Sequence, residues 1–578
     1  MVQDEVPAAP SGPDPVRDRS SQAWIHRPTE PLAGAEQGPL TGLRFAIKDN
    51  IDAATWPTTA ACPAFAYKAG EHAKAVQRLL DAGASLVGKT NLDQFACGLN
   101  GTRSPYGAVP NAFNPLYVSG GSSSGSAYVV ATGQVDFALG TDTAGSGRVP
   151  AGLNNIVGLK PSRGLISAHG VVPAAQSVDC VSIFATTVAR AAQVLAAAMA
   201  HDPADPYSRD LPMASAPFGQ QFRFGVPDRL DFFGDELAGA AFEQAVQQLR
   251  NMGGEAVPID YAPLAQCADM LYGSALVAER YSAVRGFFDE HEEAVIEPVR
   301  GILDSGREFS AADLFDAQTR LAGLSQQAAV MWRDIDLLVV PTAPTHYTIE
   351  AMLADPVQLN RNLGTYTNFV NLLDYAALAV PASQRADGLP FGITLIGRCG
   401  SDWQLAELGQ RFHHATDLPQ GATGRPLPPM EPVPGLTERP APCVRVAVVG
   451  AHLTGMPLNT QLTERGATLL ESTRTADQYR LYALANTTPP KPGLLRVAPG
   501  EGAAIEVEVW EMPLAHYGSF VALVPAPLSI GTLQLADGSA VQGFLCEPLA
   551  LTDATDITAL GGWRAYVASS HRPTRDCA

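Results

Sequence analysis

A proline-rich segment divides this sequence into two parts with different patterns. Residues 418–442 hold eight prolines in 25 positions, and proline fixes its own backbone and lacks the N–H that helices and sheets need. We therefore expect an extended linker at 418–442. The 578 residues then predict a large domain over 21–417 and a smaller one over 443–578, with residues 1–20 as a disordered arm.

The larger part alternates short apolar runs with amphipathic stretches. The predicted strands are 43–47, 85–90 and 336–341, and the predicted helices are 71–83, 188–200 and 238–254. Strand–helix alternation of this length is typical of an α/β domain, here with a mixed central sheet flanked by helices.

The smaller part is rich in strand patterns. The predicted strands are 444–451, 478–485, 504–512 and 518–524. In the third of them Ile505, Val507 and Val509 alternate with glutamates, which indicates one buried face and one solvent face. We expect a β-rich α+β domain with its own core.

Composition excludes several classes of function. A net charge of −19 with no run of Lys or Arg argues against nucleic acid as a partner. No stretch of about 18 apolar residues occurs and the N-terminus is polar, so we expect no membrane span, no secretory leader and a cytoplasmic protein. Eight cysteines without a CxxC pair, and no HExxH, give no support for a metal or other cofactor.

A glycine- and serine-rich stretch at 118–164 is the most informative segment. Its composition alone favours a flexible linker, but it leads directly into the apolar AYVVATG and the strand-like VDFALG. A phosphate loop is the competing interpretation, yet neither GxxxxGK[ST] nor GxGxxG occurs in it. Two glycine-rich turns between buried elements can direct backbone N–H groups at one oxyanion.

A nucleophilic serine in this stretch would need a base. No GxSxG motif with a suitably placed histidine occurs. Lysine is the alternative, because desolvation can lower its pKa toward 7. Lys48 directly follows the predicted strand 43–47, among apolar neighbours, although many lysines at strand ends have no catalytic role.

Four segments together resemble the amidase signature family over roughly residues 25–415. They are AIKDNID (46–52), GKTNLDQFACGLNGTRSPYG (88–107), GGSSSGSA (120–127) and TDTAGSGRVPAGLNNIVGLKPSRG (141–164). The resemblance implies the α/β fold of that family and the hydrolysis of amides. One departure is Ser124, where many members have glycine.

The resemblance also implies roles for individual residues. Ser146 would be the nucleophile, Ser122 the bridging serine that follows a cis peptide bond, and Lys48 the base. The turn Thr143-Ala144-Gly145-Ser146 would supply N–H groups to the oxyanion. The proton would pass from Ser146 through Ser122 to Lys48 and return to the leaving nitrogen.

Two further segments indicate the substrate. Tyr272 and Arg280 lie eight residues apart, on one side of a predicted helix, which by itself fits an amphipathic helix with a surface arginine. This segment resembles the substrate-binding helix of allophanate hydrolases, in which the arginine pairs with the substrate carboxylate. Residues 448–459 and 507–525 are similar to the C-terminal domain of the same hydrolases, whose fold resembles γ-glutamyl cyclotransferase.

The resemblance therefore implies hydrolysis of allophanate, a small-molecule substrate, to ammonia and carbon dioxide without a cofactor. The alternatives are another small carboxylated urea or biuret derivative, or a broad-specificity amidase. The C-terminal domain would either assist decarboxylation of the intermediate or serve assembly, and a homodimer is allowed but not required. His452 is the candidate for that assistance, His516 is a second histidine in the domain, and for either one the alternative is a hydrogen bond within a loop.

Overall fold

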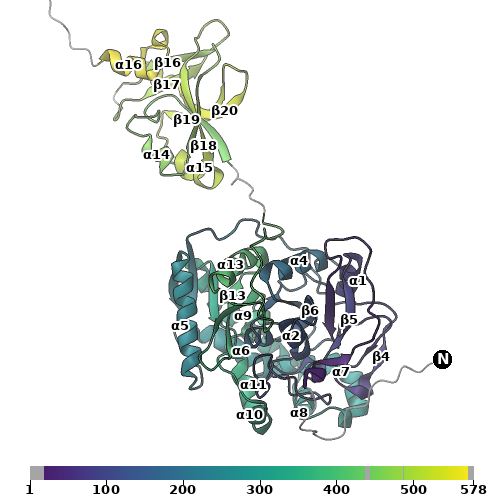
Figure 1. Cartoon of the computed structure of the whole chain (residues 1–578). Helices are drawn as coiled ribbons and strands as arrows, with labels where there is room; N and C mark the ends of the chain where they lie inside the picture. The colour runs from purple at the N-terminus through teal and green to yellow at the C-terminus, as the bar shows by residue number, and fades with distance from the viewer. Residues whose placement is uncertain (1–18, 437–442, 486, 571–578) are drawn as a thin grey trace, which may run out of the picture. The chain divides into compact units, whose positions relative to one another are not determined.

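The computed structural model describes residues 19–436, 443–485 and 487–570. The chain divides into two compact units, 1–437 (unit 1) and 438–578 (unit 2) (Figure 1). The predicted arm 1–20 lies outside the described residues except for its last two positions. Those two positions begin a short 3-10 turn, Arg19–Ala23.

A mixed sheet forms the centre of unit 1. Its strands, within the described residues, are β1 (Trp24–His26), β2 (Arg44–Lys48), β5 (Ser85–Thr90), β6 (Phe137–Asp142), β7 (Val157–Lys160), β8 (Cys180–Ala185), β9 (Phe222–Pro227), β10 (Gly254–Ile259), β11 (Leu337–Pro341), β12 (Ala376–Gln384) and β13 (Pro390–Gly397). They are ordered β1-β5-β2-β6-β8-β7-β12-β13-β11-β9-β10. Strand β2 is parallel to β5 and β6, whereas β6 to β8 and β12 to β13 are antiparallel. A separate two-stranded ladder pairs β3 (Pro57–Thr58) with β4 (Tyr67–Lys68).

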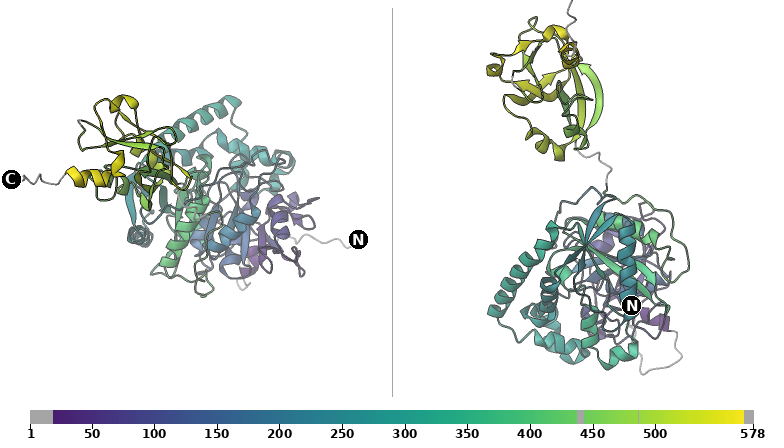
Figure 2. Two further views of the ribbon diagram at one scale, coloured as in Figure 1. Left: turned by 90° about the horizontal axis from the view of Figure 1, so that it is seen from above. Right: turned by 90° about the vertical axis from the view of Figure 1, so that its left-hand side faces the viewer.

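Helices cover both faces of this sheet, as the two views of Figure 2 show. They are α1 (Lys74–Asp81), α2 (Ser124–Ala131), α3 (Val149–Leu153), α4 (Val188–Ala198), α5 (Glu236–Asn251), α6 (Ala262–Gly273), α7 (Ala278–His291), α8 (Val299–Ser305), α9 (Ala311–Ala328), α10 (Ile349–Ala354), α11 (Gln358–Leu363), α12 (Phe369–Leu372) and α13 (Asp402–Ala415). Successive β2 residues belong to different cores: Phe45 and Ile47 pack with α1 and α4, and Ala46 packs with α2. The sheet is therefore buried on both faces, and the predicted α/β fold is confirmed.

The proline-rich segment differs from the extended linker that we expected. Residues 418–436 pack on unit 1, where Val433 is 6% exposed within the main core. Residues 418–436 form no helix or strand. Their backbone carbonyls instead accept hydrogen bonds from side chains elsewhere in unit 1. Asn155 donates to Pro419 and Gln410 donates to Glu431 at 2.9 and 2.6 Å. Residues 437–442 lie outside the described residues.

Unit 2 is β-rich. A sheet ordered β15-β18-β14-β20-β19 and a smaller one ordered β17-β16-β21 enclose a core of its own. The elements are β14 (Cys443–Val448), α14 (Thr460–Thr463), β15 (Thr468–Arg474), β16 (Tyr479–Ala483), β17 (Pro492–Arg496), β18 (Glu506–Pro513), α15 (Leu514–Val521), β19 (Leu528–Gln534), β20 (Ala540–Cys546), β21 (Thr555–Asp556) and α16 (Trp563–Ser570). This agrees with the predicted β-rich domain.

The glutamate face of β18, which we predicted to be exposed to solvent, is partly buried. Ile505, Val507 and Val509 are buried as expected, but Glu508 on the opposite face is also only 2% exposed. Its carboxylate accepts a hydrogen bond from the Arg564 guanidinium of α16 at 2.6 Å, and another from the backbone N–H of Thr454 at 2.8 Å. Helix α16 therefore covers the side of β18 that the alternation assigned to water.

The predicted strand at 518–524 is wrong, because residues 518–521 belong to helix α15 and residues 522–524 follow it without strand structure. Val524 packs into the core of unit 2 from beyond the helix, and within α15 Tyr517 and Phe520, three residues apart, pack there as well. This is the period of a helix face. His516 therefore lies on a helix, where its Nδ1 is 2.8 Å from the Arg465 carbonyl, and not at the start of a strand.

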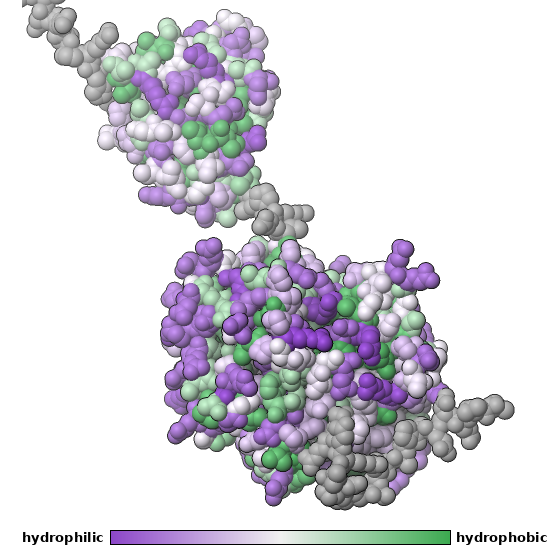
Figure 3. Space-filling view, in the orientation of Figure 1, coloured by the Kyte–Doolittle hydropathy of each residue, from purple (hydrophilic) through white to green (hydrophobic). Residues whose placement is uncertain are grey.

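Figure 3 shows hydrophilic residues over much of the visible face of unit 1, with hydrophobic ones in small groups. Within 19–436, 443–485 and 487–570, no helix is both long and apolar enough to cross a membrane.

Candidate active site

The three predicted catalytic residues form one row of hydrogen bonds. The Lys48 Nζ is 2.8 Å from the Ser122 Oγ, which is 2.9 Å from the Ser146 Oγ. Lys48 and Ser122 are fully buried and Ser146 is 2% exposed. The fold explains this meeting: β2 and β6 are parallel neighbours, so Lys48 at the end of β2 lies at the same edge as the turn after β6.

Burial changes the acid–base chemistry of Lys48. Loss of water around the ammonium lowers the pKa of Lys48 to about 7, although Asp93, Asp179 and Asp142 each raise it. Its Nζ also lies 2.7 Å from the Thr141 hydroxyl. A large fraction of Lys48 is consequently neutral at pH 7 and able to accept a proton.

The serine-rich stretch is a packed element and not a linker. Ser122, Ser123, Ser124 and Ser126 are all fully buried. The hydroxyls of Ser123 and Ser126 donate to carbonyls of β6 at 3.1 and 3.0 Å, which fastens the start of α2 to the sheet.

The backbone of Ser122 is held in place by a hydrogen bond from Asp93. The peptide between Gly121 and Ser122 is cis, as the resemblance implied. The Asp93 N–H donates to the Ser122 carbonyl at 3.1 Å, and the Asp93 carboxylate accepts from the backbone N–H of Gly101 at 3.1 Å. A Cβ at position 121 would overlap the Asp93 carboxylate, so glycine is required there.

The predicted oxyanion turn has free donors. Within the described part of the chain, the backbone N–H groups of Ala144, Gly145 and Ser146 donate no hydrogen bond. Gly145 has φ +147°, and a Cβ there would lie 2.7 Å from the Thr367 Cβ. The turn is therefore closely packed behind its backbone while its N–H groups stay available to an oxyanion.

A buried ion pair fixes both ends of this turn. The guanidinium of Arg148 contacts both carboxylate oxygens of Asp142 at 2.9 Å, and both side chains are fully buried. Burial alone would raise the pKa of Asp142, but the charge and hydrogen bonds of Arg148 outweigh it and hold the pKa below its usual value. The backbone N–H of Gly147 also donates to Asp142 at 3.0 Å.

Tyr272 and Arg280 meet although they do not share a helix. The predicted single helix breaks after Gly273, so that Tyr272 lies in the last turn of α6 and Arg280 lies in α7. The Arg280 Nη2 donates to the Tyr272 hydroxyl at 3.1 Å, and the guanidinium carbon is 4.9 Å from the centre of the tyrosine ring. Tyr272 also lines a cavity of about 390 Å³.

The Arg280 guanidinium is buried without a full set of partners. Arg280 is 3% exposed, and its Nε and Nη1 have no hydrogen-bond acceptor among the described residues. A buried cation with unsatisfied donors is costly unless a ligand completes it. Its planar N–H groups suit a carboxylate.

Sequence reasoning missed Asp179, which is bonded to the predicted oxyanion turn and lies within reach of the Arg280 charge. The Thr143 hydroxyl donates to one carboxylate oxygen, and the backbone N–H of Ala174 donates to the other at 2.8 Å. Burial raises the pKa of Asp179 to about 6. Asp179 lies outside the four motif segments, so no pattern singled it out.

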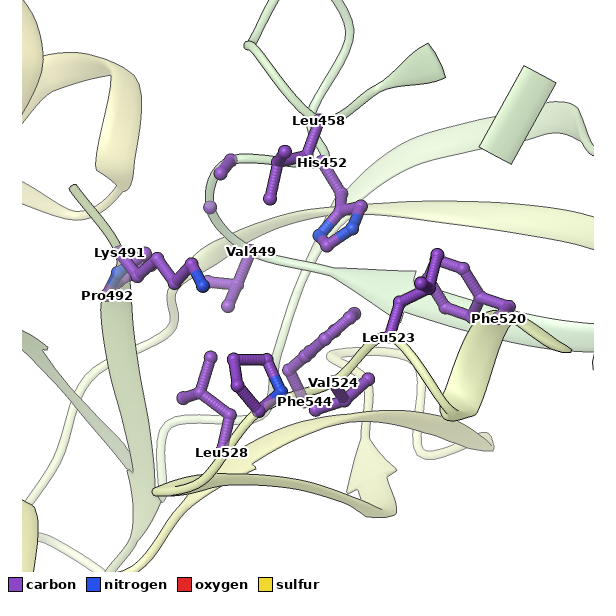
Figure 4. A pocket seen from close by; sticks show the side chains of 13 residues that line it. Val449, His452, Leu458, Lys491, Pro492, Phe520, Leu523, Val524, Leu528 and Phe544 are labelled. Carbon is purple, nitrogen blue, oxygen red and sulfur yellow. The ribbon is translucent and has the colours of Figure 1, made fainter. Parts of the chain in front are cut away.

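Unit 2 holds a separate small pocket of about 30 Å³ (Figure 4). His452 and Lys491 line it together with Phe520 and Phe544. The His452 ring stacks on Phe544 with centroids 5.1 Å apart, and its Nε2 lies 2.9 Å from the Gln461 Oε1. Burial lowers the pKa of His452. The other predicted histidine, His516, does not line this pocket.

The described residues contain no group of three or more His, Cys, Asp or Glu side chains arranged to hold a metal ion.

Comparison with protein-family models gives two matches. Residues 20–406 match the family described as Amidase, and residues 444–568 match the Allophanate hydrolase C-terminal domain.

Curated relatives differ in which part they share. The urea amidolyase of Saccharomyces cerevisiae is 44% identical over 544 residues, which is 91% of this chain and 30% of that protein. The chain thus spans about a third of the length of the urea amidolyases that it matches. A glutamyl-tRNA(Gln) amidotransferase subunit of Halobacterium salinarum is 35% identical over 65% of this chain and 96% of that protein.

Solved structures give the same picture. The allophanate hydrolase of Kluyveromyces lactis is 42% identical with a TM-score of 0.73, and the match covers 95% of this chain and 94% of that one. A glutamyl-tRNA(Gln) amidotransferase subunit of Thermotoga maritima is 28% identical with a TM-score of 0.59, over 72% of this chain and 91% of that one.

Proposed function

Because this chain belongs to the amidase family and ends in an allophanate hydrolase C-terminal domain, we propose that it hydrolyses allophanate to ammonia and carbon dioxide. The observation that carries the proposal is the buried Arg280 guanidinium, which has two unpartnered nitrogens among the described residues and whose charge acts on Lys48 of the Ser–Ser–Lys row. Allophanate is a urea with a carboxylate on one nitrogen. It offers both an amide carbonyl to a nucleophile and a carboxylate to an arginine.

The first step is acyl transfer to Ser146. Neutral Lys48 accepts the proton of Ser122, which accepts that of Ser146 as its oxygen attacks the terminal amide carbon. The N–H groups of the 143–146 turn stabilise the tetrahedral oxyanion. The proton returns along the row to the leaving nitrogen, and ammonia departs.

Water then attacks the acyl-enzyme by the same route. The products are free Ser146 and an imide that carries two carboxylates. This dianion loses carbon dioxide when its nitrogen is protonated, and the carbamate that results yields the second ammonia and second carbon dioxide.

We place that protonation in the pocket of unit 2. The ammonium of Lys491 would bind a carboxylate of the intermediate, and the dianion would raise the pKa of His452, which burial lowers. The ring would then deliver a proton to the nitrogen. In the alternative, unit 2 serves assembly or stability.

Ammonia release from allophanate by the purified protein tests the overall proposal. We expect two ammonia per allophanate. Turnover of a biuret derivative or of simple aliphatic amides at equal or higher kcat/KM would favour the other carboxylated ureas or a broad-specificity amidase.

His452→Ala tests the role of unit 2, with the exposed His516→Ala as the matched control. We expect His452→Ala to keep the first ammonia release and to lengthen the lifetime of the dicarboxylated intermediate, followed by ¹³C NMR. A truncated protein should end at residue 436, because 418–436 pack on unit 1. An unchanged lifetime in both proteins would leave unit 2 an assembly or stability element.

The cytoplasmic location and the homodimer that the sequence allows stay predictions. Size-exclusion chromatography with light scattering tests the homodimer.

A further inference from the structure

Asp179 connects two parts of the site that the mechanism uses separately. Its carboxylate accepts hydrogen bonds from the Thr143 hydroxyl on one side, and from the backbone N–H groups of Ala174 and Ala175 on the other, at 2.8 and 3.1 Å. Thr143 is the first residue of the oxyanion turn. The carboxylate therefore ties this turn to the loop 174–179.

The same loop reaches the helix that carries Arg280. The N–H and hydroxyl of Ser177 both donate to the carboxylate of Glu279, each at 2.7 Å. Glu279 precedes Arg280 directly in α7. One loop thus touches the turn that would bind the oxyanion and the helix that would bind the substrate carboxylate.

A second bridge fixes the base of this loop. The Asn371 side-chain amide donates to the carbonyls of Asp142 and Val178, at 2.7 and 2.9 Å. Asp142 is the last residue before the oxyanion turn, and Val178 precedes Asp179. Two connections therefore join the loop to the turn: the hydrogen bond between Thr143 and Asp179, and the bridge through Asn371. Only the first involves a charged side chain.

We propose that Asp179 is a positioning residue, which sets the oxyanion turn relative to the carboxylate-binding Arg280 and places a negative charge beside the Lys48 base. The proposal deepens the proposed function and rests on it. The distance between the attacked carbonyl and the carboxylate is fixed in allophanate, so the enzyme gains from a rigid link between the two groups that bind them.

The charge of Asp179 should affect the pH dependence of the reaction, which a purely structural residue would not change. The charged groups that act on Lys48 are Asp93, Asp179 and Asp142, which raise its pKa, and Arg280, which lowers it. Removal of the Asp179 charge should lower the pKa of Lys48 further. The acid limb of kcat/KM should then move to lower pH, because Lys48 stays neutral in more acidic solution.

Asp179→Asn separates charge from geometry. A carboxamide is isosteric with the carboxylate, can donate to the Thr143 hydroxyl and can accept from Ala174 and Ala175, so the link survives without the charge. We expect the acid limb of Asp179→Asn to shift to lower pH. Asp202→Asn is the matched control: Asp202 is 6% exposed and accepts from the Ser167 hydroxyl at 2.7 Å, but it is not among the charges that chiefly shift the pKa of Lys48. Its acid limb should stay in place.

Asp179→Ala and Thr143→Val each break the link. We expect either change to lower kcat for allophanate roughly 10- to 100-fold, with a smaller change in KM. Because both changes remove the same hydrogen bond between Thr143 and Asp179, the double variant should be no slower than the worse single variant, and Thr143→Ser should recover kcat relative to Thr143→Val. An additive double variant, or an acid limb in Asp179→Asn at the wild-type pH, would overturn the proposal.

A reaction without allophanate keeps this test separate from the substrate assignment. A fluorophosphonate reacts with a nucleophilic serine: the Ser146 oxygen bonds to phosphorus, fluoride leaves, and the hydroxyl proton passes to Lys48. If the wild-type protein releases no ammonia from allophanate, the proposed function fails. The pH dependence of labelling in Asp179→Asn still decides the proposal for Asp179: a shift to lower pH supports it, and no shift overturns it.

Discussion

Arg280→Lys tests how the site would recognise a carboxylate. The substitution keeps the positive charge but replaces a planar guanidinium with a single ammonium. Two of the three guanidinium nitrogens of Arg280 are buried without an acceptor, and the third is occupied by the Tyr272 hydroxyl. Lysine can supply one donor near this position but not the planar set, so at least one hydrogen bond to the substrate carboxylate is lost.

The magnitude follows from the value of one charged hydrogen bond. Such a bond contributes about 1.5–3 kcal/mol, which corresponds to a fall in kcat/KM of about 10- to 150-fold. The assay compares ammonia release from allophanate with release from biuret, in which a neutral carboxamide replaces the carboxylate. Allophanate should suffer the larger loss, and Arg300→Lys, a surface pair with Glu297, should change neither rate. Equal losses on both substrates would mean that Arg280 has a structural role and that the carboxylate binds elsewhere.

Three other predictions follow from the buried groups. Ser146→Ala or Lys48→Ala should lower kcat by at least about 10⁴-fold, since the nucleophile or its base is gone, while circular dichroism stays unchanged; substantial ammonia release by either variant would contradict the assigned roles. The pKa of Lys48 is about 7 and its neutral form is the base, so kcat/KM should rise with pH and reach half its plateau near pH 7; a rate that falls over this range would refute a lysine base. Arg148→Ala leaves the fully buried Asp142 unpaired and should reduce the free energy of unfolding by about 3–5 kcal/mol in urea titrations; a loss below about 1 kcal/mol would show that water reaches Asp142.

The motif residues were predictable because the segments that carry them resemble the motifs of the amidase signature family, and that resemblance implies that the three side chains meet. Lys48, Ser122 and Ser146 lie far apart in sequence, yet each is part of a distinctive segment that resembles a family motif. Asp179 was not predictable, since a single aspartate in a loop has no distinguishing pattern and its importance comes only from contacts with Thr143 and Ala174.

The errors in the fold have physical causes that local patterns do not reveal. The run 518–524 contains residues with high strand propensity, but Tyr517 and Phe520 of α15 pack into the core of unit 2 as one helix face. Glu508 looked solvated because alternation describes the strand alone, and the covering Arg564 comes from the far end of the domain. The prolines of 418–436 exclude regular structure but not packing on unit 1.

The complete burial of Lys48 also affects its chemical durability. A neutral amine is the form that reacts with electrophiles such as cyanate and aldehydes, so a lysine with a pKa of about 7 is intrinsically more vulnerable than one with an ordinary pKa. Here the amine lies beneath Ser122, with no exposed surface. Because the Nζ is fully buried and contacts the hydroxyls of Ser122 and Thr141, an electrophile in solution has no direct access to it, and the burial that lowers the pKa of Lys48 also protects the amine from covalent inactivation.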